Sequence, residues 1–168
     1  IHSIFGHILR LKTMANSGLI LILLVFISTS CMTQNIERTE ENRLLLESRI
    51  KEKIDSVRVK KKCSELSTDS ILYRASLHHS NYQRDKKIMS HNESVKNFKT
   101  PQDRADFYGA NGILVGENVL YTDFNNIVSS EKGKKFDCSS IENLANLIVT
   151  LWVDSPPHYK NIIDKNYT

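Results

Sequence analysis

Residues 139–163 read SSIENLANLIVTLWVDSPPHYKNII and contain the clearest helix of the chain. The apolar residues of this stretch recur at helical spacing and form one continuous stripe, made of Ile141, Leu144, Ala145, Ile148 and Trp152. Ser139 or Ser140 is placed to cap the helix, and Asp154-Ser155-Pro156-Pro157 ends it. The serine of that ending can cap a second, short helix with both prolines in its first turn. The stretch therefore predicts a helix with one buried face, followed by a turn that carries His158.

Three further helices are predicted upstream. Residues 41–58 and 68–86 each repeat apolar side chains at helical spacing, with polar residues on the opposite face. A third, short helix is marked at both ends, by Thr100 as its N-cap, Pro101 at its first helical position and Gly109 at its C-terminus.

Between the third helix and the 139–163 stretch, the sequence no longer shows the apolar spacing of a helix. Residues 111–121 combine glycine with β-branched residues and predict a loop followed by a strand. Residues 122–138 are polar, and we expect them to form a surface loop.

The composition is that of an ordinary globular protein. Of the 168 residues, 40% are hydrophobic and 25% are charged, and the formal net charge is +4. These values exclude a disordered chain, a collagen-like chain and a polytopic membrane protein. The charge is too small to indicate a nucleic-acid partner. The sequence has no phosphate-binding glycine loop and no CxxC, HExxH or GxSxG motif.

The N-terminus is interpreted as an export signal. Residues 1–13 precede the first Met and are interpreted as upstream read-through, and residues 14–30 as a signal peptide. The apolar run Leu19–Ile27 would rise only about 14 Å as a helix, against a hydrocarbon core of about 30 Å. Small residues precede Cys31 as in a bacterial lipobox, so we expect Cys31 to be lipidated and residues 31–40 to form a tether. These features predict a membrane-anchored lipoprotein of the bacterial envelope, with plain secretion or an uncleaved membrane anchor as alternatives.

The chain has three cysteines, an odd number. If Cys31 is the lipid anchor, Cys63 and Cys138 remain, and an exported protein can keep a disulfide between them. Closing a loop of that length is worth about 4 kcal/mol in the chain-entropy model. The alternative is a pair of buried free thiols.

Three residues beside turn signals could carry chemistry: His91, Glu117 and His158. Two imidazoles and a carboxylate could hold a divalent metal such as zinc and leave a position for water. Glu117 and His158 are also candidates for general acid and base catalysis. Taken alone, each residue is better explained as a hydrogen-bonding surface residue.

The order of these motifs resembles that of the CAP superfamily, which comprises cysteine-rich secretory proteins, venom allergen antigens, plant pathogenesis-related proteins and bacterial SCP-like relatives. The matching pieces run over residues 41–168 in the bacterial order: Ala75 to Tyr82 with two histidines, Ser90-His91, Arg104 to Gly109, Gly116-Glu117-Asn118-Val119, and Trp152 to Ile163. The resemblance implies an α+β fold, a three-layer α-β-α sandwich with a small antiparallel sheet, and a cleft lined by histidine and glutamate.

Carried over residue by residue, the resemblance matches His91 to the family's first cleft histidine and Glu117 to the glutamate of its GEN motif. Ser155 stands where the second glutamate of the animal branch would be, which weakens a four-ligand metal site. Arg104 and Asn118 match positions that look structural. The family normally continues through two further strands, so the resemblance implies a domain that is incomplete at its C-terminus, with the last strands of the sheet missing.

The first functional hypothesis is a non-enzymatic binding module that holds a lipid, glycan or protein ligand at this cleft. The alternatives are a metal-assisted, peptidase-like hydrolase that uses the same cleft, and a structural protein of the cell wall. Ser155 with His158 is the nearest approach to a nucleophile and its base, but Ser155 also suits a helix cap. The sequence identifies no certain cofactor.

Overall fold

The computed structural model describes residues 35–168. The predicted upstream segment 1–13, the signal peptide 14–30, Cys31 and the first part of the tether lie outside the described residues. Within residues 35–168, no helix is long and apolar enough to cross a membrane.

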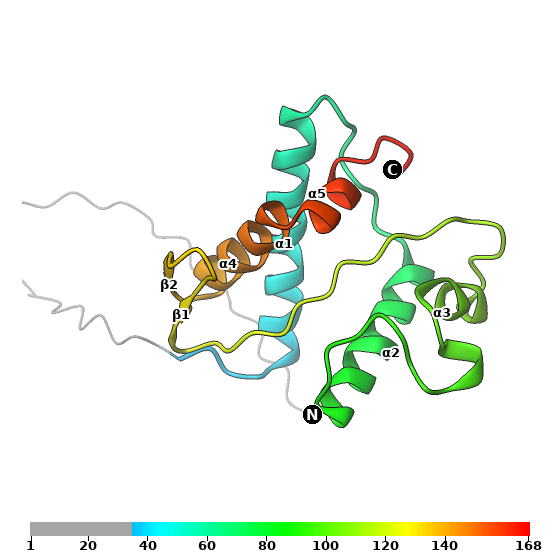
Figure 1. Cartoon of the computed structure of the whole chain (residues 1–168), viewed down its shortest axis with the longest axis horizontal. Coiled ribbons are helices and arrows are strands. Elements are labelled where there is room, and N and C mark those ends of the chain that lie inside the picture. The colour runs from blue at the N-terminus through cyan, green and yellow to red at the C-terminus, as the bar shows by residue number, and fades with distance from the viewer. Residues whose placement is uncertain (1–34) are drawn as a thin grey trace, which may run out of the picture. The chain divides into compact units, whose positions relative to one another are not determined.

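The described residues form helices and one small sheet (Figure 1). Their order is α1 (Glu40–Lys60), α2 (Ser70–Lys86), the short 3-10 helix η1 (Lys96–Phe98), α3 (Pro101–Tyr108), β1 (Ile127–Ser129), β2 (Lys135–Asp137), α4 (Ile141–Asp154) and α5 (Pro156–Ile162). The predicted α+β class with a small antiparallel sheet is confirmed. The four predicted helices and the short helix after the prolines are all present, close to the expected bounds.

The helix ends follow capping signals in the sequence. At α3, the Thr100 hydroxyl accepts from the backbone N–H of Asp103, whose carboxylate accepts from the N–H of Thr100 in return. Gly109 then ends the helix at a φ of 111°, a conformation that favours glycine. Ser140 caps α4 as predicted. Ser155 occupies the N-cap position of α5, but its side chain makes no capping hydrogen bond.

The main core lies where α4 packs against α1. Three residues of the apolar stripe of α4, Leu144, Ala145 and Ile148, are buried, and the adjacent Leu147 is 0% exposed. Leu46 and Ile50 of α1 cover it from one side. This burial explains why the sequence pattern of α4 is so regular, because most of its apolar face packs against the core.

Residues 122–138 are not a simple loop as predicted, because they contain a hairpin. β1 and β2 pair antiparallel with Val128 opposite Phe136, and both of these side chains pack against the core at α4. The turn between the strands contains Gly133 at a φ of 75°. Each strand has only three residues, too few to produce a clear alternating pattern in a polar sequence.

The strand predicted within residues 111–121 is not formed. The chain over residues 113–124 has no strand assignment, and no other strand of the described residues pairs with it. Side chains hold it instead, such as the Trp152 indole, whose Nε1–H donates to the Val119 carbonyl at 3.4 Å. Residue preference alone does not make a strand, because its ladder needs a neighbour.

The predicted disulfide between Cys63 and Cys138 is also wrong for this structure, in which both are buried free thiols. Cys63 follows α1, and its thiol lies 3.3 Å from the carbonyl of Ile163, just after α5. Cys138 lies in the core before the start of α4. The two thiols therefore lie at opposite ends of the α4–α5 segment, out of reach of a disulfide.

Both thiols are expected to resist modification in the folded protein and to react once it is unfolded. Burial raises the pKa of the Cys138 thiol, which further lowers its content of reactive thiolate. In a Cys31→Ser background without reductant, iodoacetamide should label neither thiol in buffer and both in guanidinium chloride, as read by intact mass. Absence of labelling in denaturant would reveal a disulfide and contradict the structure.

Candidate functional site

A buried charged cluster joins α2, α3 and the loop between them. Its centre is Glu93, whose side chain is fully buried. One carboxylate oxygen of Glu93 lies 2.8 Å from Nδ1 of His79, and the other lies 3.3 Å from Nε2 of His78. The Arg104 guanidinium, 1% exposed, lies 3.8 Å from Glu93. A buried carboxylate needs such partners, because burial of an uncompensated charge is very costly.

Local structure fixes each member of this cluster. His79 lies on the inward face of α2, and its second ring nitrogen, Nε2, lies 2.7 Å from the carbonyl of Ser90. Both ring nitrogens of His79 thus face oxygen atoms. Arg104 lies in the first turn of α3, where the capping box orients it, and donates to the carbonyls of His91 and Phe98.

Glu117 completes the cluster from the extended segment between α3 and β1. Its Oε2 lies 2.6 Å from Nη2 of Arg104, and its Oε1 lies 2.9 Å from Nδ1 of His91. The side chain of Glu117 is 17% exposed and that of His91 is 49% exposed, so His91 closes the cluster on its solvent side. The structure thus brings three of the predicted residues together, His91, Arg104 and Glu117.

Asn118 and the backbone carbonyl of His158 hold the same segment to α5. The Asn118 amide donates to the carbonyl of His158 at 3.2 Å. The Asn161 amide donates to the Glu117 carbonyl and to the side-chain oxygen of Asn118. Asn118 therefore ties this segment to α5, and Asn161 acts with it. Ser155 and His158 form no hydrogen bond with each other within the described residues.

His158 has a pKa below its ordinary value, first because it is partly buried and second because the positive charge of nearby His91 opposes its protonation. The folded state therefore binds fewer protons at this site than the unfolded chain just below the ordinary histidine pKa of about 6.5. Stability from neutral His158 is fully present above that value and decreases as the pH falls through the lowered pKa.

We therefore expect the wild type to lose more free energy of unfolding between pH 7 and pH 5.5 than the His158→Gln variant, which has no titrating ring. Urea unfolding followed by circular dichroism at both pH values measures this difference. Equal losses in the two proteins would show that His158 is not linked to folding.

The metal site predicted from His91, Glu117 and His158 does not fit this arrangement. Both carboxylate oxygens of Glu117 already have partners, and one partner is a guanidinium whose positive charge would repel a divalent cation. Among residues 35–168, no three histidine, cysteine or acidic side chains are grouped so as to hold a metal ion.

Sequence reasoning missed the centre of the site. Glu93 belongs to none of the motifs, and His79 is only one of the two histidines in the piece from Ala75 to Tyr82. The available signal was the position of Glu93, an acidic residue two places after His91 in a short loop between helices. Its burial depends on contacts from α2 and α3, which no local pattern reveals.

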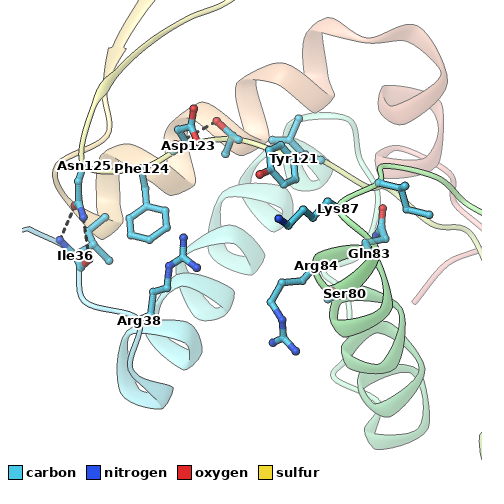
Figure 2. A pocket seen from close by; sticks show the side chains of 13 residues that line it. Ile36, Arg38, Ser80, Gln83, Arg84, Lys87, Tyr121, Asp123, Phe124 and Asn125 are labelled. Atoms are coloured by element: carbon cyan, nitrogen blue, oxygen red, sulfur yellow. Dashed lines mark hydrogen bonds between the residues drawn. The ribbon is translucent and has the colours of Figure 1, made fainter.

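Two pockets that share lining residues form one groove between α2 and residues 117–125, and the smaller of them borders the cluster. The smaller, of about 250 Å³, is lined by His79, Glu117 and Asn118 among others. The larger, of about 920 Å³, is shown in Figure 2 and extends to the chain segment before α1. Four residues line both pockets, namely Ser80, Gln83, Leu120 and Thr122. His91 and His158 line neither.

A family model described as the cysteine-rich secretory protein family, CAP, matches residues 51–168. No curated protein matches the chain significantly, and no solved structure does.

Proposed function

Because the chain belongs to the cysteine-rich secretory protein (CAP) family, we propose that it is a non-enzymatic binding module of a bacterial envelope, and that its ligand occupies the groove beside the charged cluster. The observation that carries the proposal is the pair of contacts made by the Glu117 carboxylate. Its two carboxylate oxygens contact Arg104 and His91, so it is engaged in holding the groove wall.

The geometry supports binding rather than catalysis. A general base must reach the proton that it removes, and Glu117 has its oxygens directed at Arg104 and His91. His158 does not line the groove, and Ser155 is not hydrogen-bonded to it within the described residues. The candidate nucleophile, base and metal ligands are therefore not assembled around a common position for a reacting atom.

The groove has the properties of a ligand site. The volume of its larger pocket falls in the range of about 300–1,000 Å³ that small-molecule sites occupy. Its lining combines apolar and aromatic side chains with a few charged ones, Ile36, Ile88, Leu120, Tyr121 and Phe124 with Arg38, Arg84, Lys87 and Asp123. The buried cluster beneath supplies a rigid wall, because each charged group in it is paired.

The test blocks the groove without touching the cluster. Purified full-length protein is incubated with an envelope extract, and bound molecules are identified by mass spectrometry. The wild type should retain a molecule unchanged in mass, whereas Ser80→Trp, which fills both pockets, should not. Ser56→Trp, on the exposed surface of α1 and outside the groove, is the matched control. Recovery of a hydrolysed product that Glu117→Gln leaves intact would contradict the proposal.

Placement on the envelope rests on the N-terminal sequence. We expect Cys31→Ser to move the protein from the membrane fraction to the soluble exported fraction, because the lipid-accepting thiol is gone. Immunoblots of fractionated cells measure this, with Cys63→Ser as the control that keeps the anchor. Unchanged membrane retention of Cys31→Ser would refute lipidation at this residue.

A further inference from the structure

The chain segment that follows α3 contains Asn111-Gly112, the only asparagine–glycine pair of the sequence. Both residues are exposed and form the centre of a turn, which the backbone N–H of Ile113 closes by donating to the Ala110 carbonyl at 3.0 Å. The turn is held at both ends, because Ala110 is buried and the Ile113 carbonyl accepts from the Gln102 amide at 2.9 Å. The exposed pair therefore lies between two anchored neighbours.

The peptide group between Asn111 and Gly112 takes no part in closing this turn. The closing hydrogen bond uses only the Ala110 carbonyl and the Ile113 N–H. The Gly112 N–H lies outside it and donates to no other backbone group within residues 35–168. The Gly112 nitrogen is thus directly next in the chain to an exposed amide side chain, with no backbone hydrogen bond to hold it away.

Gly112 also gives this peptide group freedom to rotate. Its φ of 82° is that of the third residue of a type II turn. Beyond its chain neighbours, no heavy atom of the described residues lies within 4 Å of the position that a Cβ would occupy. Type I and type II turns share the closing hydrogen bond and differ by rotation of the central peptide, which reverses the sign of φ at the third residue. Glycine adopts both signs, so the Gly112 nitrogen can turn toward the Asn111 side chain while the turn stays closed.

From this geometry we propose that Asn111 is a site of spontaneous deamidation in the folded protein, with water as the co-reactant. The Gly112 nitrogen loses its proton to hydroxide and forms a bond to Cγ of Asn111. The Cγ–Nδ2 bond breaks, and Nδ2 takes up a proton from water and leaves as ammonia. Water then opens the cyclic imide at either of its two carbonyl carbons and leaves its oxygen in the product, which is isoaspartate or aspartate.

The reaction changes both the charge and the length of the segment that leads to the charged cluster. A carboxylate replaces a neutral amide, and isoaspartate adds one carbon atom to the main chain between α3 and Glu117. No side chain of the cluster takes part in the reaction. The inference therefore goes beyond the proposed binding role and does not depend on it.

The experiment follows the folded full-length protein in mildly alkaline buffer made with heavy-oxygen water. At intervals the protein is digested in ordinary water, and fragment spectra of the separated peptides identify the modified residue. Asn111 should convert into two products of equal mass, with isoaspartate the larger fraction, and each should carry one heavy oxygen atom. Asn146 is the internal control, because it is exposed but precedes Leu147 within α4. Asn146 should remain unchanged.

Two variants complete the test. Gly112→Ala should slow the conversion at least about tenfold, a rise of about 1.4 kcal/mol in activation free energy, because a Cβ hinders both the rotation and the attack. Alanine is strained at the φ of 82°, so Asn111→Gln serves as a second variant, which keeps Gly112 and should not convert because its longer side chain closes a ring far more slowly.

Three results would overturn the inference. The first is conversion of Asn111 in the folded wild type that is no faster than that of Asn146, or that occurs only after unfolding in urea. The second is an unchanged rate in Gly112→Ala. The third is a labelled product that persists in Asn111→Gln, which would place the reaction at another residue.

Discussion

Replacement of Arg104 by alanine is expected to lower the free energy of unfolding by about 3–5 kcal/mol, the usual cost of removing one partner of a buried ion pair. The guanidinium is 1% exposed and lies 2.6 Å from Glu117 and 3.8 Å from Glu93. Without it, the fully buried Glu93 retains only its histidine partners, and the carbonyls of His91 and Phe98 lose their donor.

Urea unfolding followed by circular dichroism measures this effect. Arg104→Lys should recover only part of the loss, because a single ammonium cannot reproduce the planar contacts of the guanidinium. Arg74→Ala is the matched control, since Arg74 is exposed and its one hydrogen bond, to the Tyr108 carbonyl, is long at 3.4 Å. A loss in Arg104→Ala as small as that in Arg74→Ala would show that the cluster does not stabilise the fold.

The second large effect is expected at Arg58, whose replacement by methionine should cost about 3 kcal/mol or more. Arg58 is fully buried at the end of α1 and donates to four backbone carbonyls, those of Ser64, Ile162, Asp164 and Tyr167, at 2.6–3.0 Å. Hydrogen bonds from a charged donor are worth about 1.5–3 kcal/mol each, and methionine would leave these acceptors without a donor.

Limited proteolysis and urea unfolding together test this role. In Arg58→Met, residues 163–168 should become accessible to protease before the rest of the chain, because Arg58 ties them to α1. Arg49→Ala should change stability by less than about 1 kcal/mol, since the Arg49–Glu52 pair lies on the surface. A stability of Arg58→Met equal to that of Arg49→Ala would contradict the assignment.

Sequence patterns predicted those features that depend on neighbouring residues. The N-cap at Thr100 and the apolar stripe of α4 each lie within one helix, and both were predicted. Strands and disulfides depend on distant partners. The predicted strand in residues 111–121 lacks a neighbour, and Cys63 and Cys138 lie apart because α4 and α5 separate them. The hairpin was missed because its strands are too short to show a period.

The same distinction applies to the site. The family motifs identified Glu117, His91 and Arg104, and the structure brings these three side chains into contact. The motifs could not predict the role of Glu117, because that role depends on which groups contact its carboxylate oxygens. Glu93, which joins α2 to α3, carries no motif of its own. The groove was also not predictable, since its lining comes from three separate parts of the chain, residues 36–38, α2 and residues 120–125.

The central claim is that the Glu117 carboxylate holds the groove wall and is not available to a metal or a reaction. Calorimetric titration of the full-length protein with zinc at neutral pH tests it most directly. We predict no saturable one-to-one binding tighter than about micromolar, a threshold of roughly 8 kcal/mol, and the same weak response from Glu117→Gln. One-to-one zinc binding to the wild type that is tighter than about micromolar, and that both Glu117→Gln and His91→Ala abolish, would contradict the claim.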